Sequence, residues 1–390
     1  MSEPGTDQRT AAAEPKEGDL LSPAVLAERV ATLVVDKAGV RSGELPLWDR
    51  LNRSPRRPAR RSRLLPALAW CVTLGLLVVA VLRMLCHDAT VPLTWLNAFT
   101  LDLYLPAYLA LAFAARTGRW WLATASAAVV ACHLTWVLPD FRTATPYAPP
   151  ISDASGAPQS IRIFYANVRA GNLRVKDVLD EAMNADADVI ILAEVHRWWL
   201  DQLRASRLPQ AYPYGTNLWN RHGGDVNVFS RLRVSRLGQI TAETRASIVA
   251  DIPLGGETLR LFSIHSPRPL INPLCSYERF WQQIEPILAA QQGPVVAVGD
   301  FNATRHSRVY GQLEADGLRS AHEDRGRGYA TTWPNGIHWI PPIRIDQAFL
   351  SSEVECVSIE EGVGPGSDHK PLILDVRVHP FRPGLPRPAR

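Results

Sequence analysis

Three long apolar runs ahead of residue 140 constrain the fold of this chain more than any other feature of its sequence. The first run, residues 64–82 (LLPALAWCVTLGLLVVAVL), carries no charged residue. The second, 93–115, carries only Asp102, and the third, 120–139, carries no ionisable group except His133 and Cys132. A helix of roughly 20 residues crosses a hydrocarbon core of about 30 Å. We therefore predict three transmembrane helices, at about 64–85, 93–115 and 120–139.

The arginines predict which side of the membrane each part of the chain occupies. Seven arginines lie between residues 50 and 63, ahead of the first run, and Arg116 and Arg119 lie between the second and third runs. The loop after the first run has only Arg83, at its edge. Because cationic loops stay in the cytoplasm, we expect a multi-pass protein of the cell membrane, with a cytoplasmic N-terminus and its C-terminal part outside the cytoplasm.

The composition changes along the chain and indicates five segments. Residues 1–63 form a largely disordered, basic-ended cytoplasmic region, and 64–139 hold the three spans. Residues 140–159 are a Pro/Ala/Ser linker, 160–378 a folded domain, and 379–390 a disordered tail. The lipid bilayer is therefore an expected partner, and no protein partner can be predicted.

The domain at 160–378 alternates short apolar runs with helical patterns. Apolar spacing predicts helices over 175–183 and 277–290. Short runs rich in β-branched residues predict strands at 161–166, 189–193, 226–229, 248–252, 259–264, 295–298, 345–350, 354–359 and 371–376. Many strands with a few helices favour the α/β class, as a four-layered sandwich of two mixed β-sheets flanked by helices.

Charge narrows the possible partners of this domain. The whole chain has a formal net charge of +4, but residues 160–378 hold 23 Lys and Arg against 25 Asp and Glu. The domain therefore lacks the basic surface that is typical of duplex-DNA binders. Its two cysteines, Cys275 and Cys356, are the only pair that it could close, and the sequence leaves open whether they do.

Polar side chains collect where the predicted strands begin or end. They are Asn167, Glu194, His265, Asp300, Asn302, Asp346, Asp368 and His369. Each alone is ordinary, because Asp and Asn are common turn residues and a histidine that closes an apolar run is usually a core residue. As an ordered set at strand ends, they predict a single polar rim on the sandwich.

The stretches around these residues resemble the endonuclease/exonuclease/phosphatase family, which has the DNase-I-like fold. They are NVRAGN at 167–172, DVIILAEV at 188–195, FSIHSP at 262–267, VGDFNAT at 298–304, RIDQAFLS at 344–351 and SDHKPL at 367–372. The resemblance covers about residues 160 to 378, and the order of the motifs matches the family throughout. It implies a metal-dependent hydrolase of phosphoric ester bonds.

The resemblance also implies roles for individual residues. Glu194 resembles the family's metal ligand, with Asn167 beside it and Asp368 completing the site, and oxygen ligands suit Mg²⁺ or Mn²⁺. Asp300 resembles the aspartate that orients or deprotonates the attacking water, and Asn302 the residue that holds a phosphate oxygen. His369 would pair with Asp346, and His265 would face the phosphate or the leaving group.

One position departs from the family pattern. The family often carries an acidic residue two positions after the asparagine, and this chain has Arg169 there. Either the metal site relies on Glu194 and Asn167 alone, or Asn172 substitutes for the missing acid.

Fold alone does not choose a substrate. Nucleic acid and a phospholipid headgroup both remain open as phosphate-ester substrates. An alternative from another class is a catalytically silent binding or scaffold domain of the cell envelope. An inert domain would have no need of the complete polar set, and metal-dependent turnover would distinguish the two.

Overall fold

The computed structural model describes residues 61–144, 158–216, 225–243, 245–269 and 274–380. The predicted cytoplasmic region, most of the predicted linker and most of the predicted tail lie outside the described residues. Residues from Leu65 onward belong to one compact unit, which holds all the contacts given below.

Among the described residues, two helices have the length and composition of membrane spans. The first is Leu64–Cys86, within helix α3 (Arg61–Cys86), and the second is Trp120–Phe141, which joins α7 (Trp120–Val137) to the 3-10 turn η1 (Leu138–Phe141). They match the first and third predicted runs.

The second predicted run, 93–115, is not the single straight helix that we expected. It is divided into α4 (Val91–Ala98), α5 (Thr100–Leu103) and α6 (Leu105–Thr117). The direction changes by 78° between Val91–Ala98 and Thr100–Thr117, so a third span exists only if this bent pair is counted as one.

Polar bonds at the bend explain the break. The guanidinium of Arg83 donates to the side-chain oxygens of Asn97 and Thr100, on either side of the bend. Pro106 lies in the first turn of α6, where its missing N–H costs nothing. Buried hydrogen bonds to a charged group therefore outweigh continuation of the helix.

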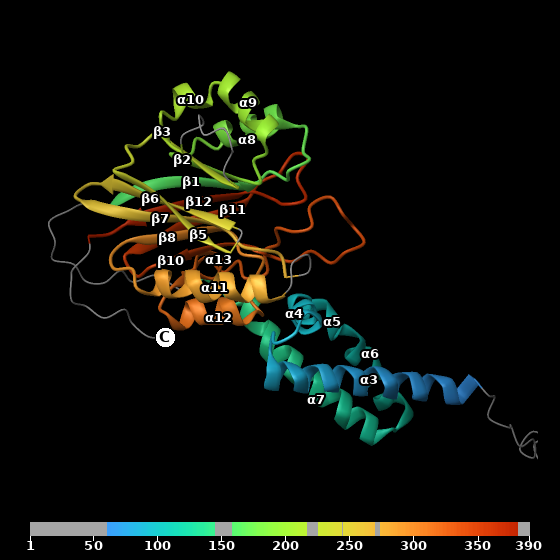
Figure 1. Ribbon diagram of the computed structural model, residues 1–390. Coiled ribbons are helices and arrows are strands. Elements are labelled where there is room, and N and C mark those ends of the chain that lie inside the picture. The colour runs from blue at the N-terminus through green and yellow to red at the C-terminus, as the bar shows by residue number, and fades with distance from the viewer. Residues whose placement is uncertain (1–60, 145–157, 217–224, 244, 270–273, 381–390) are drawn as a thin grey trace, which may run out of the picture. The chain divides into compact units, whose positions relative to one another are not determined.

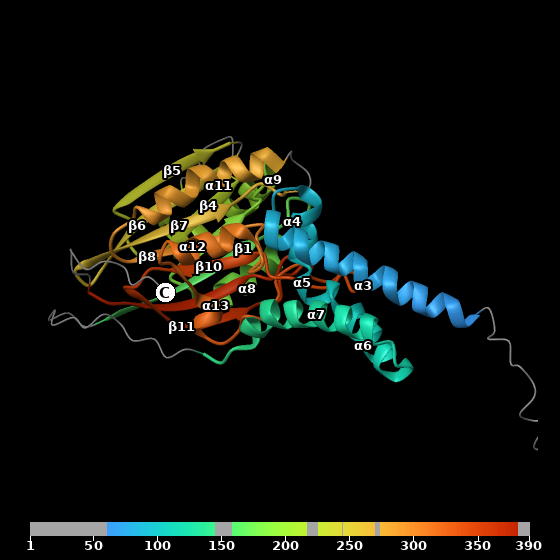
Figure 2. The ribbon, with the colours of Figure 1, turned by 90° about the horizontal axis from the view of Figure 1, so that it is seen from below.

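Helices α3, α6 and α7 pack side by side through small and branched apolar residues (Figures 1 and 2). Leu76, Ala107 and Val129 are buried between them, and the Thr73 and Ser126 hydroxyls are 3.0 Å apart. Other apolar side chains point outward, such as Leu109 at 75% exposure. An apolar outer surface of this kind is typical of helices that lie in lipid.

The C-terminal part of the chain forms two six-stranded mixed sheets (Figure 1). The first has the order β11 (Val354–Glu361), β12 (Leu372–Val378), β1 (Gln159–Asn167), β2 (Val189–Ala193), β4 (Val226–Ser230), β3 (Tyr214–Gly215). The second has the order β5 (Arg236–Ala242), β6 (Arg245–Leu254), β7 (Glu257–His265), β8 (Val295–Asp300), β10 (Asp346–Leu350), β9 (Arg319–Ser320). In each sheet one parallel pair, β1 with β2 and β7 with β8, lies at the centre.

Alternation along the central strands builds the layers. In β1, Ile161, Ile163 and Tyr165 enter the core between the sheets, whereas Phe164 and Ala166 face helices on the other side. Those outer helices are α8 (Val175–Asn184), α9 (Arg197–Ala205) and α10 (Leu208–Ala211) on the first sheet, and α11 (Leu274–Ala289) and α12 (Arg308–Ala315) on the second (Figures 1 and 2). The predicted two mixed sheets with flanking helices are confirmed.

Several elements of the domain escaped the sequence analysis, and β5 and α9 show why. Strand β5 lies at a sheet edge with mostly exposed or half-buried residues, so it carries no apolar run. Helix α9 is short and buries only Trp199, Leu200 and Leu203. In β11, Cys356 is a buried free thiol.

Candidate active site

Strand register aligns three predicted residues in one row of the second sheet. His265 ends β7 and lies opposite Asp300, which ends β8. Asp346 begins β10 and lies opposite Asp300 on its other side. All three side chains are fully buried. The row arises because parallel strands β7 and β8 end at the edge where antiparallel β10 begins.

A glycine allows this row to form. Gly299 precedes Asp300 in the Gly-Asp-Phe-Asn motif and has a φ of +155°. A Cβ atom at this position would collide with the carbonyl oxygen of Ile264 on β7. The glycine of the motif therefore permits close approach of the two strands that carry His265 and Asp300.

The first sheet presents Asn167 and Glu194 at the matching edge. Asn167 ends β1 and pairs with Ala193, the last residue of β2, so Glu194 follows directly beside it. Glu194 has a φ of +59°, and Asn302 a φ of +47°, in the left-handed region that non-glycine residues seldom adopt. Such backbone strain is common at functional sites.

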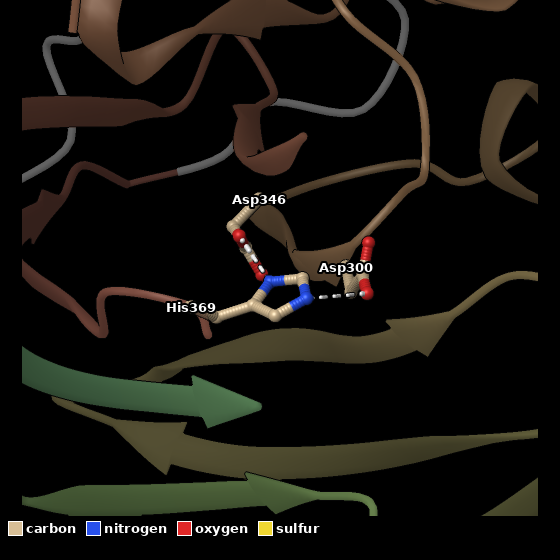
Figure 3. Close-up of side chains that lie close together, drawn as sticks. All are labelled: Asp300, Asp346 and His369. Atoms are coloured by element: carbon tan, nitrogen blue, oxygen red, sulfur yellow. Dashed lines mark hydrogen bonds and ion pairs between the residues drawn. The ribbon is translucent and has the colours of Figure 1, made fainter. Parts of the chain in front are cut away.

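Asp300, Asp346 and His369 form a tight cluster of ionisable side chains (Figure 3). Their nearest side-chain oxygen and nitrogen atoms all lie within 4.8 Å of one another. His369 Nδ1 is 2.8 Å from Asp346 Oδ2, and His369 Nε2 is 3.8 Å from Asp300 Oδ2. The imidazole therefore lies between two carboxylates, as the predicted pairing of His369 with Asp346 requires.

The two carboxylates keep this imidazole charged. Burial by itself would lower the pKa of His369, but the charges of Asp346 and Asp300 outweigh it and raise the pKa to about 9. Burial raises the pKa of Asp300, against the opposing charge of His369. A protonated imidazole is a poor metal ligand, so this cluster fits a proton donor and its orienting acid better than a metal centre.

Glu194 is connected to the same cluster through Asn167. The Asn167 amide nitrogen donates to Glu194 Oε1 and to Asp300 Oδ2, at 3.2 Å each. Arg268 donates to Glu194 Oε1 at 2.9 Å, and the Ala170 N–H donates to Oε2 at 3.1 Å. Burial would raise the pKa of Glu194, but the charges of His265 and Arg268 and these hydrogen bonds lower it, so the carboxylate is ionised.

The structure adds Asp225, which the sequence analysis missed. Its Oδ2 lies 2.9 Å from His265 Nδ1, and Arg245 holds the same carboxylate at 2.6 Å. His265 Nε2 points to the other side, 3.7 Å from Glu194 and 3.9 Å from Asp300. The only signal in the sequence is an aspartate after two glycines, immediately before the strand that begins at Val226.

The two remaining predicted residues lie at the edge of the cluster. The side-chain amide nitrogen of Asn302 donates to the Ser266 carbonyl at 3.0 Å, and the backbone N–H of Asn302 donates to Asp300 Oδ1 at 2.9 Å. Asp368 accepts from the Trp333 indole at 3.3 Å and lies 3.9 Å from Arg169 Nε. Arg169, at the position that is often acidic in the family, thus pairs with a predicted metal ligand.

Asn172 does not replace the missing acid. Its amide nitrogen donates to the Pro365 carbonyl at 2.9 Å, and its oxygen accepts from the Arg174 N–H at 2.9 Å. The oxygen and the nitrogen of the Asn172 side chain are therefore both used to join backbone segments. Of the two readings left open by the sequence, the one that relies on Glu194 and Asn167 agrees better with these contacts.

The donor set fits a hard divalent cation beside Glu194. The Asn167 amide joins Glu194 to Asp300, and Oδ1 of the predicted ligand Asp368 is buried without a hydrogen-bond partner. Carboxylate oxygens are the ligands that Mg²⁺ and Mn²⁺ prefer. Asn167 presents its nitrogen to Glu194 here, because its oxygen accepts from the Arg169 N–H at 3.0 Å. Asn167 and Asp368 remain predicted ligands.

A family model agrees with the site. The model of the endonuclease/exonuclease/phosphatase family matches residues 164–369, more than half of the chain. The chain belongs to this family. The match begins in β1 and ends at His369, so it includes every residue of the site described above. Membership supports a hydrolase that acts on phosphoester bonds.

Solved structures are similar to the same part of the chain. A humanized D. rerio TDP2 is 18% identical and aligns with a TM-score of 0.47, covering 56% of this chain and 98% of that one. Sphingomyelinase C from Streptomyces griseocarneus is 17% identical, with a TM-score of 0.42 and coverages of 55% and 99%. A family protein from Bacteroides vulgatus is 17% identical, with a TM-score of 0.45 and coverages of 56% and 99%. No curated protein matches the chain.

Proposed function

We propose that this protein is a membrane-anchored, divalent-metal-dependent phosphoesterase that acts outside the cytoplasm. The observation that carries the proposal is the convergence of Asp300, Asp346 and His369, from three separate elements, beside Glu194. A binding or scaffold domain would have no need to bury two carboxylates and a charged imidazole beside a half-buried third carboxylate, because buried charges are costly.

The side chains of the site suit hydrolysis of a phosphate ester. A divalent cation bound beside Glu194 supplies neutralisation of phosphate charge and polarisation of the phosphoryl group. Asp300 is placed to accept the proton of the attacking water, and its raised pKa suits a general base. His369 is oriented by Asp346 and holds a proton for a phosphate oxygen, while Asn302 and Arg268 supply further donors.

The overall reaction is the same for a monoester or a diester. The water oxygen forms a new bond to phosphorus, and the bond from phosphorus to the ester oxygen breaks. The ester oxygen leaves with a proton as an alcohol, and the other product is the phosphate with the oxygen from water. No oxidant or second substrate is needed.

The membrane assignment rests on the helices. Two apolar helices of sufficient length, with outward-facing leucines and valines, support anchoring in a bilayer. The proposed sidedness needs an odd number of crossings. It therefore also requires that the segment Thr100–Thr117 cross the bilayer between these two helices, and the arginine distribution supports this arrangement. Protease added to spheroplasts should remove a C-terminal tag and spare an N-terminal one. Protection of the C-terminal tag would reverse the proposed orientation.

The enzymatic proposal is tested on the full-length protein. We expect hydrolysis of bis-p-nitrophenyl phosphate or p-nitrophenyl phosphate with Mg²⁺ or Mn²⁺, and loss of turnover in EDTA that added metal restores. Asp300→Asn should lower kcat by about 10²-fold or more. If EDTA leaves turnover unchanged, the proposed metal dependence is wrong. If no substrate is hydrolysed at all, the scaffold alternative is favoured.

A further inference from the structure

The catalytic cavity has a wall that comes from the segment between the apolar helices. A cavity of about 280 Å³ opens beside His369 and Asn302. Trp95 and Ala98, both on α4, line it together with Ile343 of the family domain. Helix α4 is the part of the second predicted span that bends away from the rest. The bend thus places an apolar helix next to the reacting groups.

Specific contacts hold this wall in place. The rings of Trp95 and Trp333 meet edge to face at 6.4 Å. The Arg308 N–H donates to Asp88 Oδ2 at 2.7 Å, just ahead of α4, and Arg83 lies 3.5 Å from His306 Nδ1. Residues 303–308 directly follow Asn302, so the loop that leaves the catalytic motif is itself bonded to the helical segment.

The lining of the cavity divides by chemistry. The polar lining includes Arg268, Asn302 and His369, which suit an anionic phosphate, and also the carboxylate of Asp368, which is paired with Arg169. The rest is largely apolar, and includes Trp95, Ala98, Pro269, Trp333, Ile343 and Ile345. A ligand that satisfies both parts of the lining has a phosphate joined to an apolar group. At about 280 Å³, the cavity is near the lower end of small-ligand sites, and fits a headgroup with the first part of a chain.

A hairpin beside the cavity carries an exposed tryptophan. Trp333 and Ile343 pair as an isolated bridge, and both line the cavity. Between them, Trp339 is 83% exposed, and Ile340, Pro341 and Pro342 follow it. Tryptophan is enriched where protein meets the headgroup region of a bilayer. The arms of the hairpin therefore line the site, and its tip offers an apolar surface to lipid.

Nucleic acid fits these features less well. Single-stranded nucleic acid binds through a positively charged groove lined with aromatic residues. The cavity has two tryptophans, but its other apolar residues are aliphatic, and the domain at 160–378 has more acidic than basic residues.

We propose that the substrate is a lipid phosphoester, bound with its phosphate at His369 and Arg268 and its apolar portion against Trp95 and Ala98 of α4. This inference rests on the proposed phosphoesterase function and names its substrate class. The helical segment is then part of the active site as well as an anchor. The bond that is cleaved and its products are those given above, with the apolar chain on one product.

The test compares substrates that share one phosphoester bond and differ in their chains. The full-length protein in phosphatidylcholine nanodiscs is given dioleoyl phosphatidic acid or dioleoyl phosphatidylglycerol, with Mg²⁺. The matched soluble compounds are glycerol 3-phosphate and glycerophosphoglycerol. Bis-p-nitrophenyl phosphate reports general turnover, and a single-stranded oligonucleotide represents nucleic acid. We expect kcat/KM for at least one lipid to exceed that for its deacylated partner by about tenfold or more.

Variants of the residues on α4 test whether a preference for lipid comes from the cavity or only from anchoring of the protein in the bilayer. Ala98→Phe fills the apolar part of the cavity, and Trp95→Ala removes one of its two tryptophans. Each should lower the ratio of lipid to bis-p-nitrophenyl phosphate turnover by about tenfold. Trp198→Ala, on α9 and outside the cavity, is the control and should leave the ratio unchanged. Equal losses on both substrates, or faster cleavage of the oligonucleotide than of any lipid, would overturn the lipid assignment.

A binding measurement keeps the lipid proposal independent of turnover. In EDTA, a phosphatidic acid with brominated chains should quench tryptophan fluorescence of the wild type more than that of Ala98→Phe, which fills the cavity without adding a tryptophan. If no substrate is hydrolysed but this difference persists, the proposed enzymatic function fails and the lipid site stands. If hydrolysis occurs and the difference is absent, the lipid site fails and the phosphoesterase stands.

Discussion

At the scale of single residues, the site depends on how buried charges are paired. Removing one partner of a buried pair leaves the other uncompensated, which costs more than the pair contributes. His369 is held between Asp346 and Asp300. Asp225 contacts the Nδ1 atom of His265, and Arg245 in turn holds Asp225. Each histidine therefore has one nitrogen held by an acid and the other turned toward the centre of the site.

Asp346→Asn tests the orientation of His369. The amide cannot keep the imidazole charged, so kcat should fall by about 10²-fold or more. The pKa of His369, raised to about 9 by its two aspartates, should also fall. The alkaline limb of the pH–kcat profile, expected near that pKa, should therefore move to lower pH in the variant.

Asp186→Asn is the matched control, because Asp186 is an exposed aspartate that pairs with Arg231 at the surface. Its pH–kcat profile should overlay that of the wild type. If the alkaline limb of the pH–kcat profile does not move in Asp346→Asn, the group that titrates there is not His369.

The pairing of His369 with its two aspartates makes the stability of the fold depend on pH. The folded pKa of about 9 exceeds the ordinary value of 6.5, so the protonated His369 stabilises the fold. This contribution, on the order of 3 kcal/mol, is fully present below pH 6.5 and is lost as pH rises through 9. The difference in melting temperature between wild type and His369→Gln should therefore be large at pH 6 and small at pH 10. A constant difference would show that His369 acts through packing alone.

At the scale of elements, strand register brings the site together. His265, Asp300 and Asp346 fall in one row because β7, β8 and β10 pair as they do, and a shift of one residue would turn each side chain to the opposite face. The close approach of β7 and β8 depends on Gly299. Helix packing has the corresponding effect at α4, where Arg83 bonds both sides of the bend.

Gly299→Ala should destabilise the domain strongly. The new methyl group would collide with the backbone of β7 at Ile264, so we expect a loss of several kcal/mol, about 3 or more. Gly311→Ala on α12 is the control, because a Cβ there meets no atom within 4 Å. It should stabilise by about 0.5–1 kcal/mol, as alanine does in a helix. Melting temperatures of the two variants measure the contrast, and similar temperatures would refute it.

At the scale of the whole molecule, the first residue of the predicted linker, Asp140, is held by contacts with the loop that follows the catalytic motif. Asp140 bonds Arg305 at 2.9 Å and lies 3.2 Å from His306, and its side chain is largely buried. Close by, the rings of Phe141 and Tyr329 stack with their centroids 6.0 Å apart. The end of the third apolar run is thus attached to the loop that follows the catalytic motif.

Asp140→Ala should loosen this attachment. Loss of a buried carboxylate that pairs with Arg305 and lies beside His306 should cost about 3 kcal/mol. Hydrogen exchange should rise at 140–144 and at 305–308, and the melting temperature should fall. Asp177→Ala removes a matched but exposed ion pair with Arg174, and should cost less than about 1 kcal/mol. Equal effects of the two variants would mean that the attachment contributes no stability.

Local signals in the sequence determined much of this protein. Uncharged runs of about 20 residues predicted the apolar helices, because length and polarity suffice to define a span. Period-two and helical patterns predicted the central strands and the sandwich. The motifs around Glu194, Asp300 and His369 predicted the family, and the same strand ends supplied the eight polar residues of the predicted rim.

Only the tertiary structure decided how these parts meet. It brought Asp225 to His265, paired Arg169 with Asp368, used Asn172 to hold loops, and bent the second apolar run so that α4 lines the catalytic cavity. None of these contacts joins neighbours in the sequence. They depend on strand register and on the packing of distant elements, and a local pattern carries no information about which distant partner a side chain will reach.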